Sequence, residues 1–291
     1  MPSDDSVVRE KAVESLKSIG LKLSPSAVYS DYLPMVKRMR KGDLFSMRIS
    51  ACFLYAQIYE RLDSERRAYA RTKFLKLSKD DTPMVRRGAA QSLSILAEFI
   101  EEELSKDYTV PLLKALLQDD NDSVKIMAVY SALPIVRRLL RGQQQLIKEQ
   151  VVPPLKQAAE NKMITWRLRF SVADVAAQIC ESIAKEIVDN DIVPIYENLL
   201  VDKEPEVKSE AVAKLHDLSK YASASRMIEK LVPNLNTTTV NDLSQHVRAS
   251  LALSVCDIAN NIGKEHAITF IVPVVVQLLK DQATEVRIIL M

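Results

Sequence analysis

The sequence predicts an all-α protein, a solenoid of stacked antiparallel helix pairs that wind into a right-handed superhelix. Two recurring markers and a helix-favouring composition support this prediction. The first marker is an apolar residue followed by a base, and its apolar members stand at positions 8, 47, 85, 124, 168, 207, 247 and 286. A spacing of about forty residues that persists along a chain indicates one supersecondary unit stacked many times.

The second marker is an apolar residue followed by proline. Its prolines are Pro34, Pro111, Pro153, Pro194, Pro233 and Pro273, and only the repeat near Thr72 and Lys73 lacks the pair. The two markers keep one phase along the chain, so chance is a poor explanation for them. We therefore expect seven to eight repeats, with the repeats at both ends truncated.

The composition agrees with a helical repeat protein. Among 291 residues only five are glycine and 5% are aromatic. A glycine-poor chain rich in Leu, Ala, Lys and Glu favours helix over sheet. A solenoid can also exceed the size of a single globular core, because each repeat contacts only its neighbours.

Each repeat is predicted to hold two helices. The first helix carries the proline near its start, where a missing N–H costs little, or one turn further in, where it bends the helix. In the segment 189–200, Asp189 or Asn190 is expected to cap this helix.

The second helix of each repeat begins at the apolar–base marker. Its clearest example is 85–99, where Val85, Ala89, Leu93, Leu96 and Phe99 fall on one face, and residues 7–19 repeat that pattern. One interval between markers, from 124 to 168, is longer than the others, and we attribute it to a longer turn at 160–169.

These patterns predict a single solenoid over residues 1–291 without a linker. Its parts are a second helix at 1–22, full repeats at 23–62, 63–103, 104–142, 143–187, 188–222 and 223–263, and a truncated repeat at 264–291. Because neither end carries a polar cap, we expect an interior fragment of a longer solenoid.

Charge is distributed unevenly along the chain. The formal net charge is +2, but residues 34–90 hold fourteen Lys and Arg against six Asp and Glu. This excess indicates either an acidic partner or ordinary solvated helix faces.

The sequence also bears on the compartment. It has no apolar run long enough to span a membrane and no leader with a cleavage site. Cys52, Cys180 and Cys256 stand singly in apolar contexts, so we expect three buried thiols in a reducing compartment, the cytosol or the nucleus.

Catalytic and metal-binding motifs are not apparent. His216, His246 and His266 fall in separate repeats, and the glycines are isolated from one another. The acidic stretch 119–122 lacks the Gly and Glu of a calcium loop, so a helix-capping turn is the better interpretation. We expect no enzyme activity, no cofactor and no metal.

The base of the first marker has a structural interpretation. Its apolar neighbour packs in the core, and the base reaches an acidic residue of an adjacent turn, which gives a charge ladder through Arg48, Lys125, Lys208 and Arg248. Arg86 is followed by a second base, Arg87, and one base suffices for the ladder. Arg87 is therefore either available to a partner or part of a solvated surface.

Trp166 is the only tryptophan and stands beside Arg167. It is either a half-buried packing residue or an exposed anchor, since Trp and Arg dominate binding hot spots. Leu44 and Phe45, in the corresponding turn of an earlier repeat, would lie on the same edge.

The amino-acid sequences of three segments resemble those of a known family. Helix pairs of this length, with a proline in the first helix and Asp and Val-Arg at the turn, resemble HEAT repeats. Residues 7–16 (VVREKAVESL), 80–87 (DDTPMVRR) and 166–174 (WRLRFSVAD) resemble the scaffold (A) subunits of protein phosphatase 2A, and the resemblance runs through the whole chain in the same order.

The resemblance implies a non-catalytic scaffold whose amino-terminal turns bind the regulatory B subunit, while its last repeats bind the catalytic subunit. This chain would keep much of the first surface, while the main catalytic-subunit site would lie beyond Met291. The family's partner-binding residues carry over to Phe45, Asp81, Thr82, Pro83, Arg86, Arg87, Asp122, Trp166 and Arg167. Leu44 stands where the family usually has Trp, and the turn before Trp166 is expected to carry two extra residues.

The implied partners are thus the regulatory and catalytic subunits of protein phosphatase 2A, with no nucleic acid and no membrane. Replacing Arg86 and Arg87 by Ala should weaken regulatory-subunit binding without unfolding the stack. The alternatives are a karyopherin-like or other helical-repeat adaptor for acidic peptides and a helical-repeat nucleic-acid binder. A near-neutral chain with one Trp argues against the last.

Overall fold

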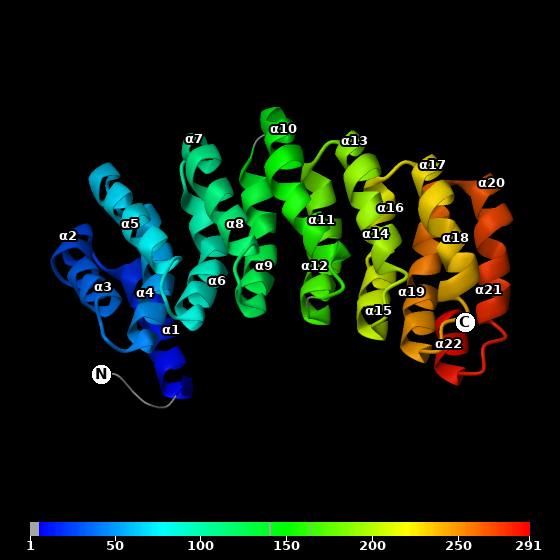
Figure 1. Cartoon of the computed structure of the whole chain (residues 1–291), viewed down its shortest axis with the longest axis horizontal. Coiled ribbons are helices and arrows are strands. Elements are labelled where there is room, and N and C mark those ends of the chain that lie inside the picture. Colours follow the sequence, from blue (N-terminus) through cyan, green and yellow to red (C-terminus); the bar gives the residue numbers. More distant parts are fainter. Residues whose placement is uncertain (1–5, 140, 164) are drawn as a thin grey trace. The chain divides into compact units, whose positions relative to one another are not determined.

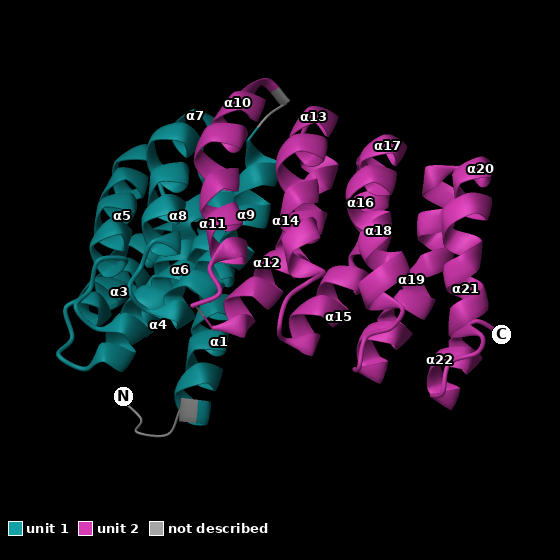
Figure 2. Cartoon of the chain, turned by 45° about the vertical axis from the view of Figure 1, so that its right-hand side comes forward, with its two compact units in different colours: residues 1–139 teal, residues 140–291 magenta. Residues whose placement is uncertain are grey.

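The computed structural model describes residues 6–139, 141–163 and 165–291. Ile164, in the turn predicted to be long, lies outside these ranges. The regular elements within them are all helices, as the sequence predicts (Figure 1). The chain forms two compact units, residues 1–139 and 140–291 (Figure 2). No described helix combines the length and the apolar character that a membrane span requires.

Unit 1 contains four second helices and three first helices. The second helices are α1 (Ser6–Lys22), α4 (Phe45–Ile58), α6 (Pro83–Phe99) and α9 (Asp122–Arg138). The first helices are the run of α2 (Pro25–Ala27), a π-helical turn (Val28–Tyr32) and α3 (Leu33–Arg40), then α5 (Ser64–Leu77), then the run of α7 (Glu102–Leu104), a π-helical turn (Ser105–Thr109) and α8 (Val110–Leu117).

Unit 2 repeats this alternation. Its first helices run through α10 (Gln144–Leu146) and α11 (Val152–Glu160), α13 (Lys185–Ile187) and α14 (Val193–Leu199), α17 (Ala224–Arg226) and α18 (Val232–Asn234), and α20 (Lys264–His266) and α21 (Val272–Leu278). Its second helices are α12 (Trp166–Ile179), α15 (Pro205–Ala213) continued by α16 (Leu215–Tyr221), α19 (Gln245–Ile262) and α22 (Thr284–Ile289).

The second helices of unit 1 pack side by side, α1 on α4, α4 on α6 and α6 on α9. Small residues permit this packing. A Cβ on Gly88 of α6 would lie 3.1 Å from Cγ2 of Ile49 on α4, so only glycine fits without displacing that side chain. On the other face of α6, the hydroxyl of Ser131 on α9 donates to the carbonyl oxygen of Ala90 at 2.7 Å.

The core of α6 confirms the predicted helix face. Val85, Ala89, Leu93 and Leu96 are buried, while Phe99 at the end of the helix is half-buried. The period of 3.6 residues places these side chains on one stripe, which the neighbouring helices cover.

The first helices show how the chain accommodates its prolines. Each apolar–proline pair follows a π-helical turn, as in Val28–Tyr32 before Pro34 and Val188–Ile192 before Pro194. Proline inside an α-helix has no N–H to donate and its ring clashes with the carbonyl four residues earlier, and a local π-turn widens the helix there. In the one repeat that lacks an apolar–proline pair, the first helix, α5, is a continuous α-helix.

The π-turns correct the predicted start of these helices. The helical run containing Pro194 begins at Lys185, with Ala184 at its N-cap, so Asp189 and Asn190 lie inside the run and do not cap it. The widened turn lets the helix continue through the proline, which therefore does not mark the helix start.

The prediction of a long turn at 160–169 is also wrong. The turn between α11 and α12 covers 161–165 and is as long as the turns at 78–82 and 200–204. The two extra residues expected before Trp166 are therefore not found in this turn. The extra length lies largely in the first helical run of that repeat, which starts with a 3₁₀ turn at Arg141–Gln143 and continues to Glu160.

The cysteines divide into two classes. Cys52 and Cys180 are buried as predicted, and burial raises the pKa of both thiols. Cys256 on α19 is exposed, which corrects the third prediction. Its side chain points away from the buried stripe that Val255 and Ile258 occupy on the same helix.

Leu93→Ala should lower the free energy of unfolding by about 3 kcal/mol, because it leaves a cavity where α6 is fully covered. Urea denaturation followed by circular dichroism measures this change. Leu253→Ala is the matched control, since Leu253 also lies inside a second helix but is 66% exposed. Equal losses for the two variants would contradict the assignment of Leu93 to the core.

Candidate functional site

The turns inside the repeats form the candidate site. In unit 1 they are the turns 41–44, 78–82 and 118–121, each followed by the start of a second helix. We call these turns and the first residues of α4, α6 and α9 the turn ridge of unit 1. Side chains on it come from successive repeats, so its geometry depends on what joins one turn to the next.

Arg48 joins the first two turns. Its Nε and Nη2 donate to the two carboxylate oxygens of Asp80 at 2.8 and 3.2 Å, and Nη2 also donates to the hydroxyl of Thr82 at 3.2 Å. Its Nη1 donates to the carbonyl oxygens of Gly42 and Asp43 in its own turn, at 3.0 and 2.9 Å. One guanidinium thus closes its own turn and holds the next one.

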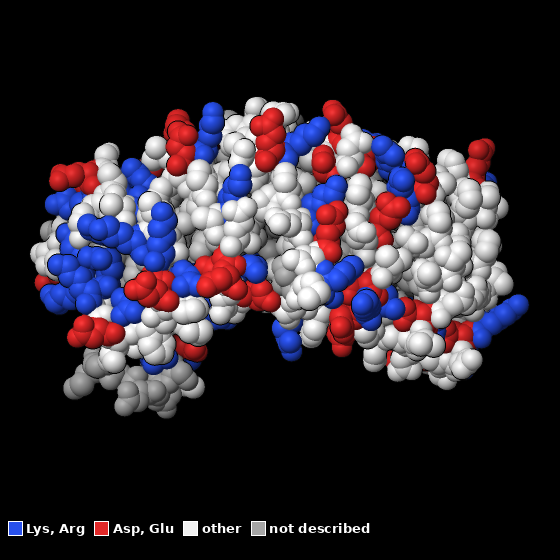
Figure 3. All heavy atoms as spheres, viewed as in Figure 1, with Lys and Arg blue, Asp and Glu red and all other residues white. Residues whose placement is uncertain are grey.

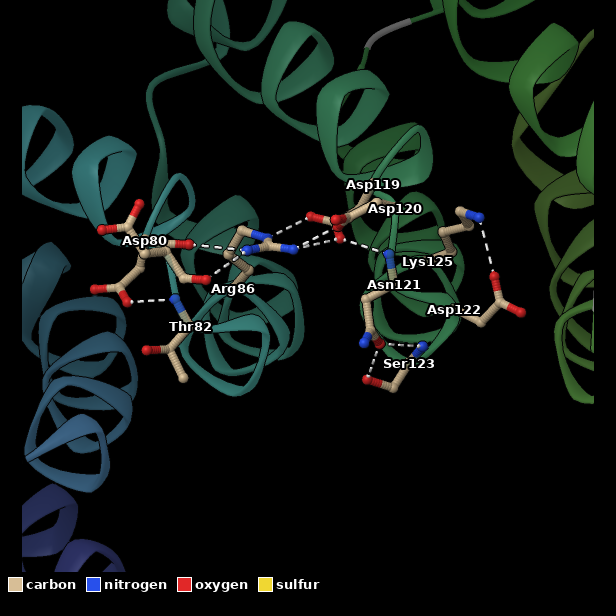
Figure 4. A network of polar contacts seen from close by, with 10 residues as sticks. Asp80, Thr82, Arg86, Asp119, Asp120, Asn121, Asp122, Ser123 and Lys125 are labelled. Carbon is tan, nitrogen blue, oxygen red and sulfur yellow. Dashed lines mark hydrogen bonds and ion pairs between the residues drawn. The ribbon is translucent and has the colours of Figure 1, made fainter.

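Arg86 repeats the arrangement one step further along (Figure 4). Its Nε and Nη2 donate to Asp119 at 2.7 and 3.0 Å, and Nη2 also reaches Asp120 at 2.5 Å. Its Nη1 donates to the carbonyl oxygens of Asp80 and Asp81, at 3.0 and 3.3 Å. Paired, charge-assisted hydrogen bonds of this kind fix orientation as well as distance.

The same arrangement occurs within unit 2. Arg169 donates to both oxygens of Asp202 at 2.7 and 2.9 Å, and Lys162 adds a contact of 2.9 Å. Further along, Lys208 pairs with Asp242, and Arg248 pairs with Asp281 at 2.6 Å. The ladder predicted from the sequence is therefore confirmed at Arg48, Lys208 and Arg248. Lys125 instead pairs with Asp122 on its own helix, α9, at 2.9 Å.

Each acidic partner also organises its own turn. One oxygen of Asp80 accepts the backbone N–H of Thr82 at 3.0 Å, and the pairs Asp119–Asn121, Asp202–Glu204, Asp242–Ser244 and Asp281–Ala283 do the same. Aspartate commonly closes a turn by accepting the N–H two residues on. This is why the motif places an acidic residue just before each second helix.

The surroundings of these carboxylates change their pKa values. Burial alone would raise the pKa of Asp202, but hydrogen bonds from Arg169, from the N–H of Glu204 and from Lys162 outweigh burial and lower the pKa to about 2. The pKa values of Asp80 and Asp119 are lowered in the same way, by Arg48 and Arg86, against the opposing effect of burial. These carboxylates are thus held ionised as parts of the structure.

The predicted binding residues of unit 1 separate into engaged and available side chains. The side chain of Arg86 is only 13% exposed and belongs to the ladder. Arg87, one residue on, is partly exposed and makes no ion pair with any described residue. Phe45 at the start of α4 is 47% exposed, and Asp81 is also exposed.

The remaining predicted residues of unit 1 lie at helix starts. Thr82 is the N-cap residue of α6 and Pro83 is its first residue, and both are partly exposed. Asp122 is the first residue of α9 and pairs with Lys125. The ladder joins the turns that precede α4, α6 and α9, and it therefore holds Phe45, Thr82 and Asp122 at successive positions along the turn ridge.

In unit 2, Trp166 and Arg167 open α12. Trp166 is half-buried, with its ring edge-on to Phe170 at a centroid distance of 6.3 Å. The exposed Arg167 places its guanidinium carbon 4.5 Å from the centroid of the Trp166 ring. The tryptophan thus packs on one side and presents a cation-covered face on the other.

Sequence reasoning missed Met84. It is 45% exposed and precedes the buried Val85, so a signal existed in the large apolar residue just outside the core stripe. Met84 and Arg87 of α6 line an open groove together with Ile49 and Phe53 of α4, and residues of α1 complete its lining. Lys17 lies over the Phe53 ring at 4.7 Å in this groove.

Within the described ranges, no group of three His, Cys, Asp or Glu side chains is arranged to hold a metal ion. The ridge offers an exposed aromatic ring, an exposed thioether and unpaired or partly exposed cations on a fixed frame. Such a set of side chains suits recognition of a protein surface.

Comparison with protein families and curated proteins gives a consistent result. A family model described as "PPP2R1A-like HEAT repeat" matches residues 185–263. The beta isoform of the human 65 kDa regulatory (A) subunit of serine/threonine-protein phosphatase 2A is 36% identical over 290 residues, which cover 98% of this chain and 47% of that protein. The Dictyostelium discoideum protein phosphatase 2A scaffold subunit is 41% identical over 110 residues, 38% of this chain and 19% of that protein. The matched part thus covers about half the length of the human relative and a smaller share of the other.

Solved structures support the fold. The crystal structure of Kap121p has a TM-score of 0.71 at 14% identity, over 97% of this chain and 29% of that one. A designed armadillo repeat protein has a TM-score of 0.52 at 20% identity, over 75% of this chain and 95% of that one. At these identities the likeness confirms an α-solenoid and nothing further.

Asp202→Asn should lower the free energy of unfolding by about 3 kcal/mol, because it leaves the buried Arg169 without its counter-charge. Thermal and urea unfolding measure the loss. Asp120→Asn is the matched control, since Asp120 is 86% exposed and Arg86 keeps Asp119. A loss below about 1 kcal/mol for Asp202→Asn would place this ion pair with ordinary surface pairs.

Stability should also fall in acid. The pKa of Asp202 is lowered from 3.8 to about 2 in the folded state, so its contribution is present above pH 4 and is lost as the pH falls toward 2. The shift corresponds to about 2 kcal/mol. Urea denaturation between pH 6 and pH 2 should show an acid-induced loss that is smaller by this amount in Asp202→Asn. Identical pH profiles would contradict the assignment.

Proposed function

Because this chain belongs to the HEAT-repeat family of protein phosphatase 2A 65 kDa regulatory (A) subunits, we propose that it is a non-catalytic scaffold of a Ser/Thr phosphatase of that type. It binds a regulatory B subunit through its intra-repeat turns and coordinates assembly with the catalytic subunit. The observation that carries the proposal is the 36% identity with the human relative over 98% of this chain.

The ridge geometry supports the proposal. In unit 1 the ladder fixes the relative positions of successive turns, so that Phe45, Met84 and Arg87 are presented from helix starts rather than from mobile loops. Pre-positioned side chains lose less conformational entropy on binding than flexible ones. In unit 2, Trp166 and Arg167 offer an aromatic anchor with a cation stacked on it.

The mechanism of such a scaffold is geometric. A protein that simultaneously binds one subunit for substrate selection and one for catalysis raises their effective concentration for one another. Catalysis would belong to the partner, and this chain would supply position. Because the matched part covers only 47% of the human relative, we propose that this chain binds the catalytic subunit more weakly than it binds a regulatory subunit.

The structure separates the expected effects of two neighbouring arginines. Arg87 has no described ion pair, so Arg87→Ala should leave stability unchanged and weaken regulatory-subunit binding by roughly tenfold or more, the loss of a typical hot-spot side chain. Arg86→Ala should lower both affinity and stability, because Asp119 loses its partner.

Biolayer interferometry with an immobilised regulatory B subunit measures the affinities, and thermal unfolding measures stability. Lys106→Ala is the control for Arg87→Ala, since Lys106 is exposed in the π-helical turn Ser105–Thr109, near the start of a first helical run and far from the intra-repeat turns. An unchanged affinity of Arg87→Ala would remove this residue from the interface. Equal effects of Lys106→Ala and Arg87→Ala would argue against a specific ridge contact.

A further inference from the structure

Five cations gather on the first helices of unit 1. Lys37, Arg40 and Lys41 come from α3 and its C-cap, and Lys73 and Lys76 come from α5. We call these five residues the basic patch. Figure 3 shows Lys and Arg side chains concentrated at this end of unit 1. The patch accounts for much of the charge excess of residues 34–90, which the turn ridge does not explain.

The patch lacks counter-charges. No described carboxylate forms an ion pair with any of its five members. Three other arginines of unit 1 are paired, Arg48 with Asp80, Arg71 with Glu101 and Arg86 with Asp119.

The cations are held close to one another. Lys37 and Lys73 both lie against the ring of Tyr69, with Nζ at 4.5 and 4.8 Å from its centroid. Burial lowers the pKa of Lys73, and the positive charges of Lys76, Arg40, Lys41 and Lys37 lower it further. Like charges held together without a counter-ion repel one another, and an anion bound among them removes that repulsion.

We infer that the basic patch is a docking surface for an extended acidic segment of a protein partner, a run rich in Asp and Glu. Alternate side chains of an extended peptide are about 7 Å apart. Lys37 of α3 and Lys73 of α5 suit such a spacing, because their Nζ atoms lie 4.5 and 4.8 Å from the centroid of the same Tyr69 ring. Carboxylates on one face of such a segment can therefore reach lysines of α3 and α5 together. This inference is independent of the proposed function.

Other polyanions fit the patch less well. A nucleic-acid backbone is bound by a broad basic face, whereas this chain has a net charge of only +2 and the patch covers two helices. Membrane-surface binding commonly adds exposed Trp, Phe or Leu beside the cations. The ring of Tyr69, beside the patch, does not supply such a side chain, because Lys37 and Lys73 lie over it.

Fluorescence anisotropy with a labelled twelve-residue peptide of alternating Glu and Ser tests the inference on the whole 291-residue chain. The peptide should bind, and K41E/K76E should weaken binding by about tenfold, since each reversed surface charge contributes ~0.5–1 kcal/mol. The control K185E/K203E makes the same change in net charge at exposed lysines of unit 2 and should bind as the unaltered chain does. Thermal unfolding checks that both variants remain folded.

Three outcomes would overturn the inference. The first is no binding of the Glu/Ser peptide at 50 mM salt. The second is an equal loss of affinity in K41E/K76E and K185E/K203E, which would indicate a general charge effect. The third is tighter binding of a twelve-base single-stranded DNA or of phosphatidylserine vesicles, tested in parallel, because the patch would then serve a different class of polyanion.

Discussion

The contact between an arginine or lysine of one turn and an aspartate of the next is the interaction on which the rest of the structure depends. The aspartate closes its own turn through a backbone N–H, and the base closes its turn through two carbonyl oxygens while it reaches forward. The guanidinium of Arg86 makes both contacts of the base, backward to the carbonyl oxygens of Asp80 and Asp81 and forward to Asp119. Local turn geometry and the spacing of repeats are therefore set by the same side chains.

This arrangement explains how the turn ridge of unit 1 can present a binding surface although its turns are short. The ladder is mostly buried, with Arg169 and Asp202 at 4% and 0% exposure. Adjacent residues such as Phe45, Met84 and Arg87 need no structural partner and can be used for recognition. In the first helices, a π-turn before each apolar–proline pair lets the helix continue through the proline. The alternation of first and second helices is therefore kept from repeat to repeat within each unit.

The fold was largely predictable from the sequence, because a period of about forty residues and a buried stripe such as Val85, Ala89, Leu93 and Leu96 are local patterns. The start of the helix at Lys185 was not, since nothing in the sequence distinguishes a proline at a helix start from one placed after a π-turn. The exposure of Cys256 and the length of the turn at 161–165 likewise depend on packing and helix length that single residues do not reveal.

The candidate site was predictable only in outline. The family resemblance predicts both Arg86 and Arg87 as partner-binding residues, whereas the hydrogen bond of Arg86 to Asp119, 33 residues away in the chain, places Arg86 in the ladder. Met84 was overlooked because an apolar residue at a helix start resembles core. The family resemblance predicts which residues bind a partner, and the hydrogen bonds between repeats show which of these side chains the ladder engages.

The most direct test of the scaffold proposal is calorimetric titration of this 291-residue chain with a purified regulatory B subunit of protein phosphatase 2A and, separately, with the catalytic subunit. The account predicts saturable binding of the regulatory subunit, with weaker or no binding of the catalytic subunit. A full-length scaffold of the same family serves as the positive control for both titrations. Failure of the regulatory subunit to bind this chain, while it binds that control, would contradict the account.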